Sequence, residues 1–218
     1  MSVDSLEWFD IPSVLSRTAA SVLGLSKVPI VELDETHRPL VLAHLLALDP
    51  EDRRLRFSHP LSDLGIARYM NNVDFKRDSL FGIFGKDDML VGVLHLALIP
   101  HEEGSTAPVA AELGLSLRPE VRGHGLGTAL FKRALRHARN LGVERLFIFT
   151  LMDNEPMLGI ARKLEMDVVK ADGQCEAHLK LPPASTMSTV TEFMDENLAQ
   201  LDKLFKRSLT QVLSWADL

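Results

Sequence analysis

The spacing of apolar positions along the chain predicts a sheet of short strands with helices packed against it. Apolar runs that fit strands lie at 28–33, 80–84, 89–99, 111–117, 146–151, 166–170 and 175–181. Apolar residues with the three-and-four spacing of a buried helix face lie at 40–48, 61–70, 126–141 and 157–164. Strands and helices alternate in the second half, which is typical of a βαβ crossover in a mixed α/β fold. The run at 146–151 is apolar on both faces, so we expect a central strand covered on both sides.

Turn and cap residues predict several element boundaries. Asp34 can cap the first helix, and Asp49-Pro50 is expected to end it. The Gly85-Lys86-Asp87-Asp88 segment between two apolar runs indicates a β-hairpin. Gly142 is the expected stop of the helix that follows the glycine-rich turn. Together these elements predict a mixed sheet of about six or seven strands flanked by helices.

Pro182-Pro183 marks the end of a folded domain. We expect an N-terminal arm, a main domain and a C-terminal extension, at residues 1–27, 28–182 and 183–218 respectively. The extension carries one apolar stripe at helical spacing, preceded by a capping-box pair, Thr189 and Glu192. A lone amphipathic helix does not leave such a stripe in water. We therefore expect it to pack on its own domain or on a second copy in a homodimer.

Composition and charge exclude two classes of partner. The chain has 218 residues, of which 46% are hydrophobic and 25% charged, with a formal net charge of −6. An acidic chain lacks the positive charge that dominates nucleic-acid affinity, so we expect no nucleic-acid partner. The longest strongly apolar stretch, 89–100, contains His95, an expected core residue. It is shorter than the about 20 residues of a membrane-spanning helix, so we expect no membrane partner.

The N-terminus and the cysteine content favour a cytoplasmic protein without a structural metal. Asp4, Glu7 and Asp10 precede the first basic residue, Arg17, which is unlike a signal peptide. Cys175 is the only cysteine, and we expect an ordinary strand residue there. One cysteine excludes an internal disulfide framework and a cysteine-built zinc site. The eight histidines show no metal-ligand spacing, so we expect no metal.

A glycine-rich turn between the strand at 111–117 and the next helix is the most informative segment. Gly123, Gly125 and Gly127 allow backbone amides to point toward one site, and the helix behind adds the positive end of its dipole. Such a turn can bind an anion. Its G-x-G-x-G spacing differs from the G-x-G-x-x-G of a Rossmann loop, and the Gly-Lys-Ser/Thr of a P-loop is missing.

Local charge points to the same ligand class. Within 118–139 a single acidic residue, Glu120, is accompanied by six Arg or Lys residues at 118, 122, 132, 133, 136 and 139. This excess favours a phosphate-bearing ligand. The alternative is a tight turn followed by an amphipathic helix whose basic face is simply solvated. His124 is expected on the loop surface.

This segment resembles the GNAT N-acetyltransferases. Arg122-Gly123-His124-Gly125-Leu126-Gly127 matches the family signature R/Q-x-x-G-x-G/A, and the strand at 144–149 and helix at 154–166 look like its next region. The resemblance is strong over 110–168 and weaker over 28–100. Leu48 to Phe57, with the Met157-Leu158-x-x-Ala161-Arg162 pattern, resembles the bacterial protein-lysine acetyltransferase type in particular.

The resemblance implies acetyl-CoA as cosubstrate and names the residues that hold it. The backbone of Gly123, His124, Gly125, Leu126, Gly127 and Thr128, with Arg122, would bind the pyrophosphate, and the strand end at Leu115 and Leu117 the pantetheine amides. Asn154 stands where the family has a cofactor contact, although it can equally be a helix cap. A bulky residue at Gly125 or Gly127 is expected to abolish CoA binding and leave the fold largely intact.

Acetyl transfer to an amine requires a base, because an alkylammonium with a pKa of about 10.4 is protonated at neutral pH. The resemblance implies Glu112, at the start of the strand before the turn, and its alternative is an exposed strand-edge charge. Glu102 and Glu103 are the other candidates. Strand alternation predicts that Glu112, Gly114 and Ser116 share one face.

The family's usual general acid is missing. A tyrosine seven residues after the asparagine is common there, and this chain has Ala161. Its only tyrosine, Tyr69, is far from the motif in sequence. Thiolate would then leave unprotonated, or be protonated by water or another donor. Glu165 also replaces a glycine common in the last turn of that helix.

Three functions fit these observations. The first is an acyltransferase of the EC 2.3.1 type, an N-acetyltransferase that moves the acetyl group of acetyl-CoA to a primary amine. Its acceptor would be a small molecule or a protein lysine. The second is a non-catalytic acyl-CoA-binding regulatory module, which the missing tyrosine would suit. The third is an interaction protein organised around the C-terminal helix.

Overall fold

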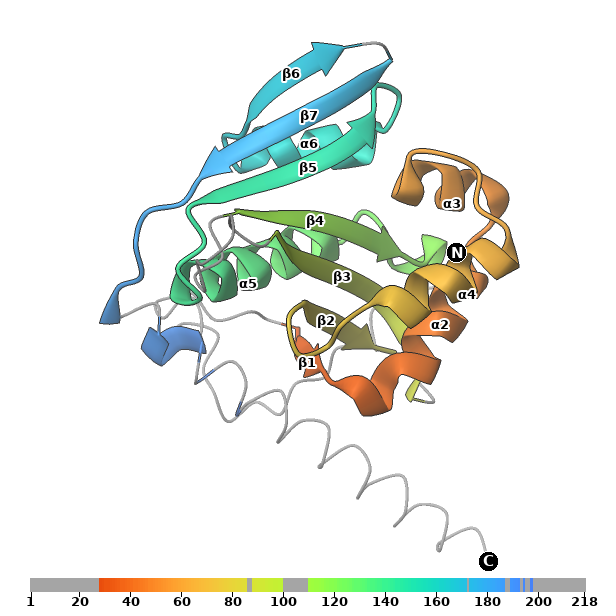
Figure 1. Cartoon of the computed structure of the whole chain (residues 1–218), viewed down its shortest axis with the longest axis horizontal. Helices are drawn as coiled ribbons and strands as arrows, with labels where there is room; N and C mark the ends of the chain where they lie inside the picture. Colours follow the sequence, from red (N-terminus) through yellow and green to blue (C-terminus); the bar gives the residue numbers. More distant parts are fainter. Residues whose placement is uncertain are drawn as a thin grey trace, which may run out of the picture.

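A computed structural model describes residues 28–85, 88–99, 110–171, 173–186, 189–192, 194 and 197. Seven strands form one mixed sheet in the order β1-β2-β3-β4-β5-β7-β6 (Figure 1). The strands are β1 (Val31–Leu33), β2 (Ser79–Phe84), β3 (Leu90–Ile99), β4 (Ala110–Leu117), β5 (Arg145–Leu151), β6 (Asp167–Ala171) and β7 (Gln174–Lys180). Among these seven described strands, β4 and β5 are the one pair that runs parallel, as a βαβ crossover requires.

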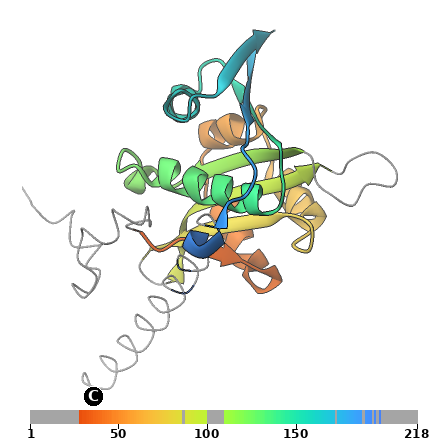
Figure 2. The same ribbon diagram turned by 90° about the vertical axis from the view of Figure 1, so that its left-hand side faces the viewer.

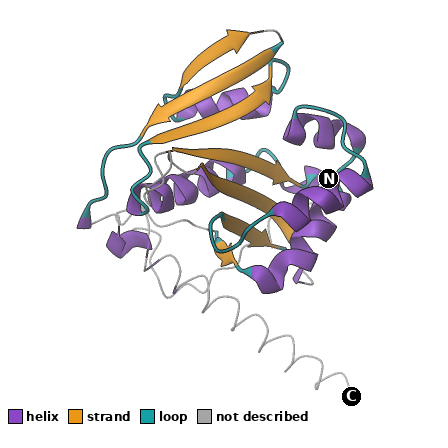
Figure 3. Cartoon of the chain, in the orientation of Figure 1, coloured by secondary structure: helices purple, strands orange, loops and turns teal. Residues whose placement is uncertain are grey.

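Helices cover the two faces of this sheet unequally. They are α2 (Arg38–Leu46), α3 (Pro50–Phe57), α4 (Asp63–Asn72), α5 (Leu126–Asn140) and α6 (Glu155–Lys163). Helices α5 and α6 lie on one face, and α2, α3 and α4 lie on the other (Figures 1 and 2). Among the described residues, the 3-10 turn η2 (Glu35–His37) precedes α2, and the 3-10 turn η4 (Pro119–Val121) precedes the glycine turn. Helices and strands thus form the three layers seen in Figure 3.

Each face of the sheet has its own apolar core. On the α5 side, Leu94, Leu96 and Leu113 from the strands pack with Leu130 and Phe131 of α5. The core on the α2 and α4 side consists of buried residues from both helices and the first three strands: Leu33, Val41, Leu45, Leu48, Ile66, Met70, Val73, Leu80, Leu90 and Val93. The predicted strand and helix faces therefore bury the apolar positions that defined them.

The segment after α2 differs from its prediction. Helix α2 ends at Leu46, before Asp49, and the Asp49 carboxylate accepts a hydrogen bond from the Asp52 amide at 2.7 Å and caps a further helix, α3. Pro50 is the first residue of α3, where its missing N–H costs nothing. The sequence pattern did not predict α3, because this helix has no fully buried residue and therefore no apolar stripe at helical spacing.

The expectation that the strand at 146–151 is covered on both sides is wrong. Leu146, Ile148 and Thr150 of β5 are buried toward α5 and α6, whereas Phe149 on the opposite face is 46% exposed. Helix α3 reaches β5 on this side of the sheet, whereas the same face of β7 and β6 is open in Figure 1. The apolar side chains on this face therefore form a surface.

The start of the C-terminal extension also differs from its prediction. Thr189 lies inside a helical turn, and its amide donates to the Ser185 carbonyl at 3.1 Å. Glu192 does not cap this turn, because its carboxylate binds side chains of α5. The N-terminal arm and most of the amphipathic C-terminal helix lie outside the described residues. In the part that is described, no helix is both long and apolar enough to cross a membrane.

Candidate functional site

β4 and β5 separate partway along their length. Their paired residues end at Glu112 and Phe147, while β4 stays paired with β3 as far as Leu117. The Arg118 amide donates to the Val91 carbonyl of β3 at 2.8 Å. Because successive residues point their backbone groups to opposite sides of a strand, those of Leu115 and Leu117 point away from β3. This edge of β4 faces the opening toward β5.

The glycine turn follows directly after this open edge. Gly123 and Gly125 have φ angles of +80° and +81°, in the left-handed region that favours glycine. Gly125 begins α5 without a capping side chain, and the first helical hydrogen bond joins Ala129 to the Gly125 carbonyl at 3.0 Å. The amides of residues 126–128 precede that bond. They and the helix dipole make this end of α5 attractive to an anion.

The three glycines of the turn have different roles. A Cβ at Gly123 or Gly125 would meet nothing within 4 Å. A Cβ at Gly127 would lie 3.0 Å from Ile160 Cδ1 and 3.2 Å from Leu115 Cδ2. Gly127 therefore permits α5 to pack against β4 and α6, so a bulky residue there is expected to disturb the fold, contrary to the prediction. His124 is exposed, as predicted.

Arg122 holds the turn in place. Its guanidinium donates to the Leu117 carbonyl at 2.8 Å and to the Asp52 carboxylate of α3 at 2.6 Å. The Leu117 contact occupies one backbone acceptor of the open β4 edge. The Arg122 side chain is 43% exposed, and its guanidinium lies between this edge and α3.

The basic residues of 118–139 do not form one patch. Arg133 is buried and binds Glu192, at 2.6 Å. Arg139 donates to the carbonyls of Pro182 and Pro183. These two side chains thus hold the C-terminal segment. The sequence could not separate them from Arg122, because residues on one helix point in several directions.

Helix α3 spans the opening between β4 and β5. Besides the Arg122–Asp52 contact, Arg54 binds the Asp153 carboxylate after β5 at 2.7 Å. Asn154 is buried, and its side-chain oxygen accepts from the Met157 amide at 3.2 Å as the N-cap of α6. Its amide nitrogen donates to the Leu55 carbonyl of α3 at 3.3 Å. The capping role of Asn154 is therefore present, and a cofactor contact stays a prediction.

Glu112 lies on the sheet face that α2, α3 and α4 partly cover. It is exposed, and Gly114 and Ser116 follow it on the same face, as strand alternation predicts. A Cβ at Gly114 would collide with the Arg56 guanidinium of α3. Ser116 Oγ lies 2.9 Å from His44 Nε2, and the Leu90 carbonyl lies 3.0 Å from His44 Nδ1. Glu102 and Glu103 lie outside the described residues.

His44 is a buried neutral histidine beside this face. Burial is the main cause that lowers its pKa to about 4, and the nearby charges of Arg118 and Arg56 act in the same direction. The hydrogen bond to the Leu90 carbonyl only partly offsets them. At neutral pH the imidazole is therefore uncharged and locks α2 onto β3 and β4.

A chain of polar side chains lies on the same face, next to Gly114. Arg56 donates to Tyr69 Oη at 2.9 Å, and Tyr69 Oη lies 2.6 Å from His95 Nδ1. His95 Nε2 lies 3.2 Å from the Asp78 carboxylate. His95 and Gly114 are Cα partners across β3 and β4. His95 is a buried residue, as predicted, and through its contact with His95 the side chain of Tyr69, remote in sequence, reaches the paired strands β3 and β4.

Asp78 is held ionised in this chain. Burial raises the pKa of its carboxyl, but the adjacent His95 and the hydrogen bonds from Arg77 outweigh that effect and keep the pKa well below its ordinary value. Arg77 binds both carboxylate oxygens, at 2.8 Å and 3.1 Å. The Leu98 amide adds a third donor at 3.3 Å. No local sequence pattern marks this group, because its members come from four separate segments.

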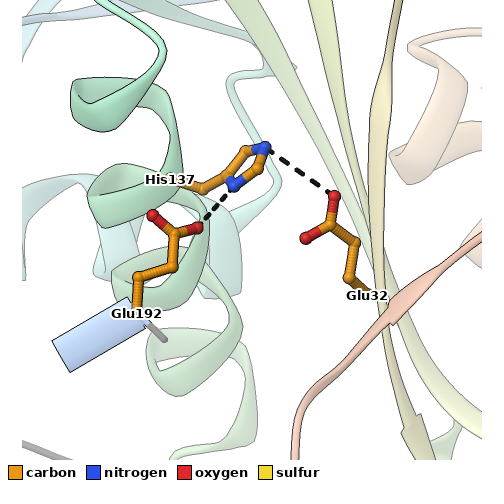
Figure 4. A group of neighbouring side chains, drawn as sticks. All are labelled: Glu32, His137 and Glu192. Carbon is orange, nitrogen blue, oxygen red and sulfur yellow. Dashed lines mark hydrogen bonds and ion pairs between the residues drawn. The ribbon is translucent and has the colours of Figure 1, made fainter. Parts of the chain in front are cut away.

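A second cluster of ionisable side chains lies on the α5 side (Figure 4). Glu32 of β1, His137 of α5 and Glu192 have ligand atoms within 4.8 Å of one another, as a metal site would need. The Arg133 guanidinium lies 2.6 Å from Glu192 and 3.5 Å from Glu32. This buried cation already neutralises the carboxylates, so the geometry is that of an ion-pair network that anchors the C-terminal segment.

Comparison with known proteins identifies the family. A family model described as an acetyltransferase (GNAT) domain matches residues 28–167. The chain belongs to the GNAT acetyltransferase family. The fold agrees, since the GNAT domain of S. lividans PAT superimposes with a TM-score of 0.59 at 16% identity, covering 70% of this chain and 89% of that one.

Two further relatives are acetyltransferases by name. Spermidine N-acetyltransferase from Vibrio cholerae, solved with CoA and spermine, has a TM-score of 0.53 at 14% identity and covers 70% of this chain and 95% of that one. Mycothiol acetyltransferase from Saccharomonospora viridis is 36% identical over 67 residues, which is 31% of this chain. That match spans only 22% of the relative's own length. The two names differ in what is acetylated, so neither relative fixes the acceptor of this chain.

Proposed function

We propose that the chain is an acetyl-CoA-dependent N-acetyltransferase whose catalytic domain comprises residues 28–182. The observation that carries the proposal is the continuity of two binding surfaces. The open backbone edge of β4 runs directly into the glycine turn and the uncapped start of α5. An extended amide-containing arm with a phosphate end fits such a surface.

The residues around the opening suit the two parts of this cosubstrate. The amides of residues 123–128 would hold the pyrophosphate, with Arg122 close by. The backbone groups of Leu115 and Leu117 would pair with the pantetheine amides, although the Leu117 carbonyl would first have to exchange its Arg122 contact. When bound, acetyl-CoA supplies the activated acetyl group. A side chain on Gly123 or Gly125 would project into this approach path.

Glu112 is the proposed base for the acceptor. It is exposed on the face that carries Gly114, at the last residue pair before β4 and β5 separate. A carboxylate there can attract an alkylammonium and remove its proton, directly or through one water. The acceptor is accordingly a primary amine, of a small molecule or a protein lysine.

The chemistry at the leaving group differs from that of relatives with a tyrosine on α6. Ala161 occupies that position, is 1% exposed and carries no proton to donate. The thiolate therefore leaves without a donor from α6. A non-catalytic acyl-CoA-binding module is the competing function, because loss of this donor would also be expected there.

Two measurements test the proposal. Calorimetric titration with CoA should show saturable binding. Thiol release from acetyl-CoA should exceed background hydrolysis when a panel that includes spermidine and a blocked lysine peptide is added. Binding without acceptor-dependent release would support the regulatory module, and absence of CoA binding would overturn both functions.

A further inference from the structure

The Arg56–Tyr69–His95–Asp78 chain has the layout of a proton relay. Each member touches the next through a polar atom, and the three contacts measure 2.9, 2.6 and 3.2 Å. Asp78 and His95 are buried, at 5% and 8% exposure, whereas Tyr69 and Arg56 are half-buried. The chain thus begins in the core and ends beside Gly114, where β4 leaves β5.

The partners fix the direction of proton movement. His95 Nε2 lies 3.2 Å from the Asp78 carboxylate, within ion-pair distance but without hydrogen-bond geometry, so the adjacent negative charge favours a proton on Nε2. His95 Nδ1 is then a free acceptor for the Tyr69 hydroxyl. Tyr69 Oη in turn accepts from the Arg56 guanidinium, whose positive charge favours negative charge on that oxygen. Asp–His–hydroxyl chains of this kind activate the oxygen at their end.

The Arg56 guanidinium is available to stabilise negative charge on the Tyr69 oxygen. Among the described residues no carboxylate pairs with it, and its guanidinium stacks near the rings of Phe57 and Tyr69, at 4.8 Å and 5.6 Å from their centroids. Its neighbours Arg53 and Arg54 are both paired with acidic residues. A cation held against a phenol and a glycine, without a counter-charge, is suited to stabilise a transient anion.

The proposed reaction needs two proton transfers from nitrogen. An alkylammonium that becomes an amide loses one proton before it attacks and a second after the C–N bond forms. A single carboxylate holds one proton, so Glu112 can accept the first proton but cannot accept the second until it has released the first. Glu112 and the relay reach the sheet at adjacent positions, since Ala97 pairs with Glu112 and His95 pairs with Gly114.

We propose that Tyr69 is a catalytic residue that accepts the second proton, with His95 and Asp78 as its positioning residues. The amine nitrogen bonds to the thioester carbonyl carbon, and the C–S bond breaks with its electron pair on sulfur. The nitrogen proton passes to Tyr69 Oη as the hydroxyl proton passes to His95 Nδ1. The imidazolium, stabilised by Asp78, later returns its proton to solvent, and solvent protonates the thiolate. This inference rests on the proposed function.

Tyr69→Phe removes only the hydroxyl and keeps the ring, which packs edge-on against Phe57 at 5.1 Å. With acetyl-CoA and the best acceptor of the panel, we expect kcat to fall by about 10² to 10⁴, as losses of general-base catalysis do. The Kd for CoA should stay unchanged, and the Tm should fall only by the few degrees that the loss of the two Tyr69 hydrogen bonds costs. His95→Gln should fall similarly, and the double variant should be no slower than either single one. The exposed His59→Gln is the matched control and should keep wild-type kcat.

The outcomes separate this inference from the function on which it rests. Wild-type kcat in Tyr69→Phe would overturn the relay and leave acetyl transfer standing. If the losses in kcat multiply in the double variant, or if CoA affinity falls by the same factor as kcat, the four side chains have only a structural role. Either result would also overturn the relay. A wild-type chain that binds CoA without acceptor-dependent thiol release would overturn the transferase proposal, and the relay with it.

Discussion

Glu112 and Phe147 are the last Cα partners that join β4 to β5 before the two strands diverge. Side chains of parallel partners share a face, so Phe147 and Glu112 point to the same side of the sheet. Phe147 stacks with Phe149 at 6.4 Å, and His178 packs edge-on against it at 5.1 Å. Glu112 therefore stands at the border of an aromatic surface, a suitable place to receive an amine on an apolar arm.

Glu112→Gln should separate catalysis from cosubstrate binding. The amide cannot take a proton, so kcat/KM near neutral pH should fall by about 10² to 10⁴, while the Kd for CoA stays near wild type. Raising the pH should partly restore the rate, because solvent then supplies neutral amine. Steady-state kinetics between neutral and alkaline pH would check this, and an undiminished kcat/KM would exclude Glu112 as the base.

Gly125→Ala tests the glycine turn, with Gly142→Ala as a matched control. Both glycines have left-handed φ angles, +81° and +77°, and a Cβ added at either would have no atom within 4 Å. Each substitution should cost about 1 kcal/mol through the same backbone strain. Only Gly125→Ala should weaken CoA binding, measured by calorimetry. Equal CoA affinities in the two variants would remove the turn from the binding site.

Glu165→Gly should stabilise the fold. Glu165 follows α6 with a φ of +55°, a conformation that side chains other than glycine adopt at a cost. The Met166 amide closes the turn on the Ala161 carbonyl at 3.0 Å. Glycine should raise the free energy of unfolding by about 0.5 to 1 kcal/mol, visible in urea titrations. An unchanged or lower value would show that the glutamate side chain offsets the strain.

His44 should make stability depend on pH. Its pKa is lowered to about 4 in the folded protein, below the ordinary 6.5, so the unfolded chain binds more protons between these values. Stability should therefore fall as the pH drops from about 6.5 toward 4, by up to about 3 kcal/mol. Thermal melts of the wild type and of His44→Gln should show a flatter profile in the variant over that range.

Glu192→Gln should loosen the C-terminal segment. Burial raises the pKa of Glu192, but the hydrogen bond from His137 and the charge of Arg133 outweigh it and hold the pKa at about 2. Its contribution is therefore present above about pH 4.5 and is lost as the pH falls toward 2. The variant should melt earlier at neutral pH, whereas the exposed Glu144→Gln should not. If both variants melt at the same temperature, Glu192 does not anchor the C-terminal segment.

The elements and the glycine turn could be predicted from the sequence because their signals are local. Apolar spacing, glycine positions and caps such as Asp34 act over a few residues, and the G-x-G-x-G segment carries its chemistry in consecutive backbone groups. The sequence also placed Glu112 on the face of Gly114 and Ser116, since alternation along a strand is fixed by its geometry.

Tertiary packing alone decided which side chains meet. Tyr69, His95 and Asp78 are far apart in the chain and are joined only when α4 packs on β3, so no local pattern could connect them. The same holds for Arg133, which looked like part of a basic surface and is buried against Glu192. Backbone conformation follows from neighbours in sequence, whereas contacts between side chains follow from how whole elements pack.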